Sequence, residues 1–135
     1  MRGFGLFVFG LVGLVGCASA PPPQSCPAQF ELSVNPGTAT ADHSSTAPGN
    51  QQKFTAYSSP TVANASGQCA EPAVEAAVNA TWTSSDPLDV SVSSAPGATN
   101  GVAICSGMTS SPVTLTATYV IAGVTKTGTA ELSCK

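Results

Sequence analysis

One short segment contains the residue types of a hydrolytic triad. Asp42-His43-Ser44-Ser45 places a carboxylate, an imidazole and two hydroxyls in adjacent positions, and His43 is the only histidine of the chain. A Ser-His-Asp triad is assembled from separate segments, because consecutive residues on a strand or turn do not bring the three side chains into line. We therefore interpret His43 as a solvated loop residue and predict that the protein has no catalytic residues and is not an enzyme.

The carboxylates and cysteines are too scattered for a metal site. Asp86 and Asp89 flank Pro87, but a calcium site needs about six to eight oxygen ligands, and the chain has no dense acidic loop. This pair instead predicts a turn at Asp86-Pro87. Zinc sites use closely spaced ligands, whereas even the nearest two of the four downstream cysteines, Cys105 and Cys134, lie far apart in the sequence. We expect no bound metal and no cofactor.

The N-terminal sequence has the three-part plan of a secretory signal. Arg2 supplies a positive charge, and residues 3–16 form an apolar run of Phe, Leu, Val and Gly. This run is shorter than the ~20 apolar residues that a membrane-spanning helix needs, and its glycines weaken it further. We therefore predict a cleaved signal peptide rather than a retained membrane helix.

The cleavage site distinguishes a lipoprotein signal from an ordinary one. Leu14-Val15-Gly16-Cys17 resembles the bacterial lipobox, in which an aliphatic residue, a small or β-branched residue and Gly or Ala precede a Cys. The resemblance implies that residues 1–16 are removed and that the Cys17 thiol is acylated, so that its acyl chains hold the protein on a membrane. Ala18 is not the Asp that commonly retains such lipoproteins at the inner membrane, so the resemblance favours the outer membrane or cell surface. Ordinary cleavage after Ala18-Ser19-Ala20 is the alternative.

Composition restricts the remaining chain to one small exported domain. Residues 17–25, with three consecutive prolines, predict a stiff tether, and residues 26–135 have a normal size for a single core. The net charge is −3 and there is no basic patch, so nucleic-acid binding is not expected. Four cysteines in an exported domain indicate two disulfides with three possible connectivities, and they are Cys26, Cys69, Cys105 and Cys134.

Alternating apolar and hydroxyl residues predict strands throughout this domain. The clearest is 113–121, where Val113, Leu115 and Ala117 share one face. Frequent turn signals separate the segments, a pattern typical of a sandwich. Residues 71–78, rich in Ala and Glu, are the one candidate helix, and it is too short to stand alone. We predict seven strands, at residues 29–35, 51–58, 79–84, 88–93, 101–105, 113–121 and 125–133.

The order of motifs resembles the group 2 bacterial immunoglobulin-like domains. That family carries a Trp-x-Ser-Ser-Asp motif on a central strand, followed by a Val-rich, a Gly-led and a Thr-rich strand. The matching segments here are Trp82-Thr83-Ser84-Ser85-Asp86, Asp89-Val90-Ser91-Val92, Gly101-Val102-Ala103-Ile104 and residues 113–118. The resemblance implies an all-β, immunoglobulin-like antiparallel β-sandwich with Trp82 in its core rather than stacked on a ligand. The long 60–78 connection and the four cysteines depart from the family pattern.

The strand order of such a sandwich implies how the cysteines pair. With strands running alternately down and up, Cys26 and Cys69 fall at one end of the sandwich. Cys105 and Cys134 fall at the other end. The resemblance therefore implies disulfides between Cys26 and Cys69 and between Cys105 and Cys134.

The anchor and the resemblance together lead to a functional hypothesis. The family commonly occurs in adhesins and other surface proteins, so we expect a noncatalytic, lipid-anchored cell-envelope or surface protein that binds a protein or glycan. Residues 60–78 are the expected contact region, because loops on a rigid scaffold carry binding. The alternative is a structural envelope or assembly subunit with no external ligand, whose edge strand pairs with another sheet.

Overall fold

The strand predicted at residues 113–121 forms the centre of the larger sheet. The computed structural model describes residues 26, 30–64, 66–70 and 75–135. In it, β11 spans Val113–Ile121 and β12 spans Val124–Cys134. The two strands pair along the whole length of β11. The inward-facing residues of β11 are buried, while the threonines between them are partly exposed. β2, Thr38–Ala41, and β8, Thr81–Ser84, complete this sheet in the order β2-β12-β11-β8.

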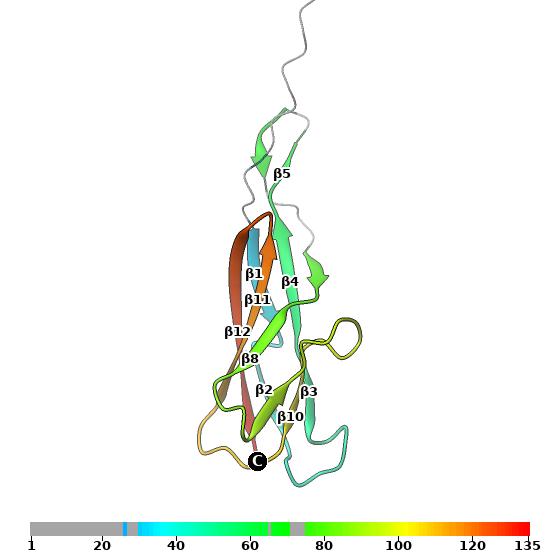
Figure 1. Cartoon of the computed structure of the whole chain (residues 1–135), viewed down its shortest axis with the longest axis vertical. Coiled ribbons are helices and arrows are strands. Elements are labelled where there is room, and N and C mark those ends of the chain that lie inside the picture. Colours follow the sequence, from blue (N-terminus) through cyan, green and yellow to red (C-terminus); the bar gives the residue numbers. More distant parts are fainter. Residues whose placement is uncertain (1–25, 27–29, 65, 71–74) are drawn as a thin grey trace, which may run out of the picture.

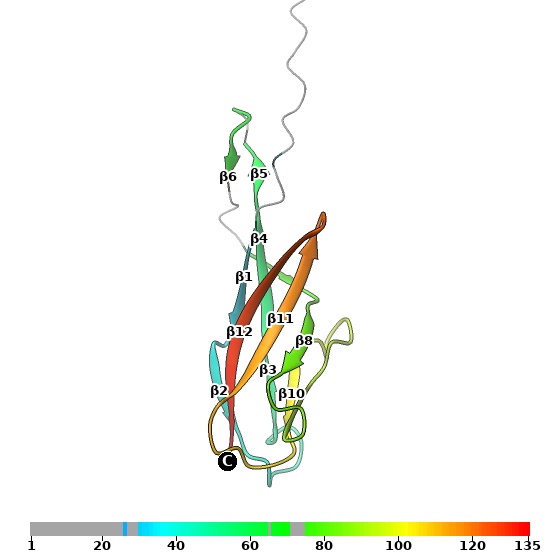
Figure 2. The ribbon, with the colours of Figure 1, turned by 60° about the vertical axis from the view of Figure 1, so that its left-hand side comes forward.

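The opposing layer consists of two three-stranded sheets. One has the order β1-β4-β7, with bounds Phe30–Asn35, Thr55–Pro60 and Ala76–Val78. The other has the order β3-β10-β9, with bounds Gln51–Lys53, Val102–Cys105 and Val90–Val92. β5, Val62–Ala63, and β6, Cys69–Ala70, form a separate hairpin beyond β4 (Figure 1). Figure 2 shows the two layers from the side and confirms the predicted all-β sandwich.

Apolar side chains from both layers meet in a single core. Phe54, Leu115 and Leu132 are fully buried, and small residues such as Ala103 and Ala117 lie among them. Burial of each large apolar side chain contributes roughly 1.5–3 kcal/mol. The core therefore holds the two layers together, and the side chains of both layers depend on each other for burial.

The strand predicted at residues 51–58 is interrupted at Phe54. Before this residue β3 pairs with β10, and after it β4 pairs with β1. The Phe54 N–H donates to the Gly101 carbonyl at 2.9 Å, and its side chain is fully buried. The chain therefore passes from one sheet of this layer to the other at a residue that is fixed on both its backbone and its side chain.

Two further features differ from the expectations. β2 was not expected, and it pairs with β12 in parallel, whereas the other described strand pairs are antiparallel. The Asn35-Pro36-Gly37 turn separates β2 from β1, so that the chain leaves the sheet of β1 and reaches β12.

The prediction of a helix at 71–78 is wrong over its second half, where β7 pairs with β4. Sheet pairing there outweighs the helix propensity of alanine. Residues 71–74 lie outside the described residues.

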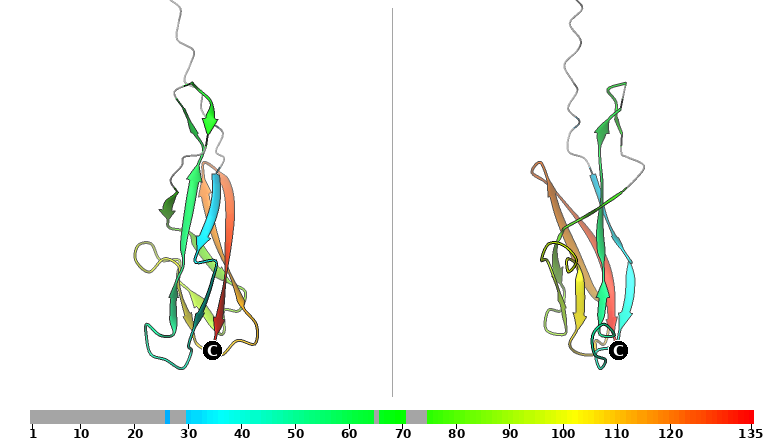
Figure 3. Two further views of the ribbon diagram at one scale, coloured as in Figure 1. Left: turned by 180° about the vertical axis from the view of Figure 1, so that it is seen from behind. Right: turned by 90° about the vertical axis from the view of Figure 1, so that its right-hand side faces the viewer.

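Two disulfides tie opposite ends of the sandwich, as predicted. One joins Cys26 to Cys69 in β6, and the other joins Cys105 in β10 to Cys134 in β12. With sequence separations of 43 and 29 residues, each closes a loop that restricts the unfolded chain by about 3–4 kcal/mol. We call the end with Cys26–Cys69 the hairpin end (residues 60–64, 66–70 and 119–124). The opposite end, with residues 42–50, 85–89, 106–112 and Lys135, is the carboxylate end (Figure 3).

Gly101 provides a test of the close approach at Phe54. Its φ of +77° is a left-handed conformation, and a Cβ there would overlap the Phe54 carbonyl oxygen. Gly97 has a φ of +91° but open space around it, so it is a matched control. We predict that Gly97→Ala costs about 1–2 kcal/mol of unfolding free energy and that Gly101→Ala costs roughly 1–3 kcal/mol more. Urea denaturation measures both, and equal losses would contradict the proposed overlap.

Candidate functional site

A buried asparagine organises the centre of the domain. The Oδ1 atom of Asn100 accepts hydrogen bonds from the Ala80 N–H at 3.1 Å and from the Trp82 Nε1–H at 2.9 Å. Its Nδ2 atom donates to the carbonyls of Ala80 at 2.9 Å and Ser94 at 3.1 Å. The side chain of Trp82 is only 4% exposed. Trp82 is therefore a core residue, as expected, and its polar atom is satisfied inside the protein.

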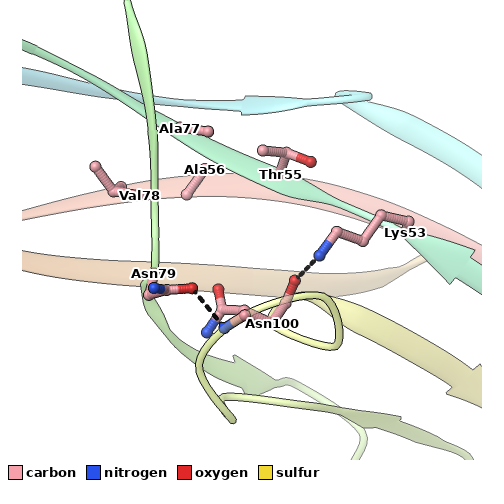
Figure 4. A pocket seen from close by; sticks show the side chains of 8 residues that line it. Lys53, Thr55, Ala56, Ala77, Val78, Asn79 and Asn100 are labelled. Carbon is pink, nitrogen blue, oxygen red and sulfur yellow. Dashed lines mark hydrogen bonds between the residues drawn. The ribbon is translucent and has the colours of Figure 1, made fainter.

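A small cleft beside Asn100 is also occupied by internal interactions. The cleft has a volume of about 140 Å³, and Lys53, Asn79 and Asn100 contribute to its lining (Figure 4). The Lys53 ammonium donates to the Ala98 carbonyl at 3.0 Å and to the Asn100 carbonyl. Asn79 accepts from the Gly97 N–H at 3.0 Å. These contacts hold the loop from Ser94 to Gly101, and the cleft is smaller than the ~300 Å³ at which ligand pockets begin.

The residues of the apparent triad lie at the carboxylate end. The Asp42 carboxylate accepts from the Ser44 N–H at 2.9 Å, the Ser44 hydroxyl at 2.7 Å and the Ser45 hydroxyl at 2.9 Å. The Nδ1 atom of His43 contacts the carbonyl of Lys135, and the His43 N–H donates to the same oxygen. Both hydroxyls thus donate to the carboxylate, and the imidazole faces the main chain of Lys135. This geometry stabilises a turn.

The same hydrogen bonds change the acidity of Asp42. The Ser44 hydroxyl, followed by the Ser44 N–H and the Ser45 hydroxyl, lowers the pKa of the Asp42 carboxyl below its ordinary value. Desolvation opposes this shift, and the neighbouring His43 adds a smaller lowering effect. The charged form of Asp42 is therefore the one that the folded turn favours.

Two adjoining loops at the carboxylate end carry exposed apolar side chains. Leu88 is 88% exposed and Met108 is 71% exposed. The loops are joined because the Ser106 N–H donates to the Asp89 carbonyl at 2.8 Å, and a side chain at Gly107 would overlap the Asp89 carboxylate. Between them lies an open groove of about 350 Å³, lined by Asp86, Asp89, Met108, hydroxyl residues 109–111 and Pro112.

The carboxylates of this groove have no cation beside them within the described residues. Among the described residues, Lys126 in β12 and Glu31 in β1 form an ion pair at 3.8 Å, and this pair is not in the groove. The Asp86 Oδ1 atom is 3.4 Å from the Asp89 N–H, which fits the predicted turn. Across the described ranges, no group of three or more His, Cys, Asp or Glu residues is arranged to hold a metal ion. The groove thus combines unpaired negative charge with exposed apolar surface.

The hairpin end has a different surface. Val62 in β5 is 48% exposed and Val120 in β11 is 55% exposed. The described residues of both hairpins, 62–70 and 119–124, contain no charged side chain. Over the part of the chain that the structure describes, no helix is long and apolar enough to cross a membrane. Cys17 and its neighbours lie outside the described residues.

Comparison with known proteins finds no matching family model and no matching curated protein. The resemblance to group 2 immunoglobulin-like domains therefore stays a prediction, as does the lipobox.

Sequence reasoning missed the structural role of Asn100, because the Asn100-Gly101 dipeptide indicates only a turn. It also missed the exposure of Leu88 and Met108, because exposure of an apolar residue has no local sequence signal.

We predict that Asn100→Asp destabilises the protein strongly. The carboxylate would face the carbonyls of Ala80 and Ser94, which now accept from the amide, so two favourable contacts become repulsive. The expected loss of unfolding free energy is at least ~2 kcal/mol. Asn79→Asp keeps its acceptor for Gly97 and is the matched control, with an expected change within about 0.5 kcal/mol. Similar urea midpoints for the two variants would show that the Asn100 network carries little stability.

Asp42 should titrate below the ordinary range of an aspartate. Because its folded-state pKa is lowered, its contribution to stability is present above the unfolded pKa and is lost as the pH falls through the folded value. Carboxyl-carbon NMR titration measures this pKa directly. Ser44→Ala should raise it toward the ordinary value and Ser45→Ala should raise it less. An unchanged pKa in Ser44→Ala would refute the assignment.

Proposed function

We propose that the protein is a noncatalytic, lipid-anchored envelope module that binds a protein partner through the loops of its carboxylate end. The lipobox resemblance at Cys17 supports the anchor, and two disulfides are typical of an oxidising compartment outside the cytoplasm. The observation that carries the proposal is the Cys26–Cys69 disulfide, which holds the beginning of the domain at the hairpin end. The carboxylate end is then the end of the domain that is remote from the anchor.

The length of the tether strengthens this assignment of ends. Nine residue steps separate Cys17 from Cys26, so a fully extended tether spans at most about 30 Å. A lipid at Cys17 therefore keeps the hairpin end close to the bilayer. Residues 60–64 and 66–70, the described first part of the segment expected from the sequence to contact a ligand, belong in this arrangement to the membrane side. The loops best placed to meet a partner are those of the carboxylate end.

The chemistry of the groove favours a protein partner over a glycan. Exposed Leu88 and Met108 offer apolar area of the kind that protein interfaces bury, and methionine is enriched in such interfaces. Sugar rings are commonly recognised by stacking on aromatic side chains, and the residues that line this groove include no aromatic ring. Asp86 and Asp89 complement cationic side chains. The expected partner is a protein segment that combines Lys or Arg with apolar residues.

The anchor is tested by fractionation and protease shaving of intact cells that express the wild type or Cys17→Ser. We expect the wild type in the membrane fraction and sensitive to the protease, and the variant released from the membrane. A wild type that is not membrane-bound would refute the anchor. An anchored but protected wild type would favour the assembly subunit that the sequence left open.

The binding surface is tested by photocrosslinking in cells. A photoreactive phenylalanine analogue replaces Leu88 in one variant and Val120, at the opposite end, in a matched control. We expect a discrete protein adduct from position 88 that is absent from position 120 and is weakened by Asp86→Asn with Asp89→Asn. Adducts of equal yield at both positions, or an adduct that is insensitive to the two aspartates, would contradict the proposed partner chemistry.

A further inference from the structure

We infer that the hairpin end of the anchored domain rests on the lipid surface, so that the β5–β6 hairpin and the β11–β12 turn form a membrane-contacting face. This inference rests on the proposed acylation of Cys17. It goes further than the anchor, since a tether alone would leave the domain free to face the bilayer with any of its sides.

The exposed apolar residues of this end support lipid contact. Val62 and Val120 are both about half exposed, and Ile121 and Val124 beside the turn are partly exposed. Val120 lies on a well-fixed element, because β11 and β12 stay in register up to the Ile121–Val124 pair. Ala122 and Gly123, with φ values of 49° and 80°, close a tight two-residue turn. The apolar tip is therefore presented by a rigid hairpin.

The distribution of charge points in the same direction. The described residues of the two hairpins carry no charge, and the neighbouring Glu31 and Lys126 form an ion pair. Asp42, Asp86 and Asp89 are at the opposite end of the domain, together with Lys135. An anionic bilayer repels carboxylates within a Debye length of its surface. A domain held near such a bilayer is therefore oriented with the uncharged hairpins toward the lipid and with Asp42, Asp86 and Asp89 away from it.

The short length of the tether and its attachment point bring this face to the lipid. The tether ends at Cys26, which the disulfide places beside Cys69 in the β5–β6 hairpin, and it is at most about 30 Å long. The hairpin end consequently has a high effective concentration at the bilayer, so a weak apolar contact is enough to orient the domain.

The two hairpins also imply a tilt. In Figure 2 the β5–β6 hairpin extends farther along the long axis, and the β11–β12 turn is displaced to one side of it. A flat bilayer can touch both only if the long axis of the sandwich leans toward the β11–β12 turn. The carboxylate end then projects obliquely from the membrane.

The test places a tryptophan at each end of the acylated full chain. Val120→Trp reports on the hairpin end and Met108→Trp on the carboxylate end; both positions are exposed, and the buried Trp82 of the wild type provides the background signal. Each protein is reconstituted in vesicles of phosphatidylethanolamine and phosphatidylglycerol, with and without brominated phosphatidylcholine. We expect quenching at position 120 several-fold greater than at position 108. Adding Val62→Asp to Val120→Trp should reduce the quenching.

Flotation of the same samples separates the two proposals. If the protein floats with the vesicles but position 120 is not quenched more than position 108, the membrane-contacting face is refuted and the anchor stands. If the acylated protein does not float, the anchor is refuted and this inference fails with it. Cooperative urea unfolding of both tryptophan variants confirms that the comparison concerns folded protein.

Discussion

The Cys26–Cys69 disulfide is the constraint on which the functional account depends. It fixes where the chain enters the domain, so the hairpin end is next to any anchor at Cys17 and the carboxylate end is remote from it. Noncovalent contacts alone would hold this point weakly, because β5 and β6 are two-residue strands with exposed side chains. If Cys17 is acylated as proposed, the disulfide gives the sandwich a membrane side and a side that faces away from the membrane.

The second disulfide and the core determine the form of the carboxylate end. Cys105–Cys134 ties β10 to β12 next to the loops that carry Asp42, Asp89 and Met108. Toward the middle of the domain, Asn100 satisfies the Trp82 indole and Gly101 allows the chain to approach Phe54, where β3 gives way to β4. Polar groups in the middle thus support the fold internally, whereas Asp86 and Asp89 at the carboxylate end form no ion pair with the described residues.

The sequence predicted the elements whose signals are local. The alternation at 113–121 identified β11. Both disulfide pairings were predicted from the strand order that the resemblance to immunoglobulin-like domains implies. Other features depend on contacts distant in sequence. β2 has only four small residues and is defined by its parallel pairing with β12, and the break at Phe54 lies inside a continuous strand-like pattern. For the same reason the sequence could not show that the loops carrying Leu88 and Met108 adjoin each other.

Mass spectrometry of nonreduced peptides from membrane-extracted protein tests this account most directly, because one map reports on all five cysteines. The account predicts a Cys26–Cys69 crosslink, a Cys105–Cys134 crosslink and a Cys17 N-terminal peptide whose mass includes acyl chains. A Cys69–Cys105 crosslink would contradict the assignment of ends. An N-terminal peptide that begins after Ala20, or an unmodified Cys17, would contradict the anchored orientation.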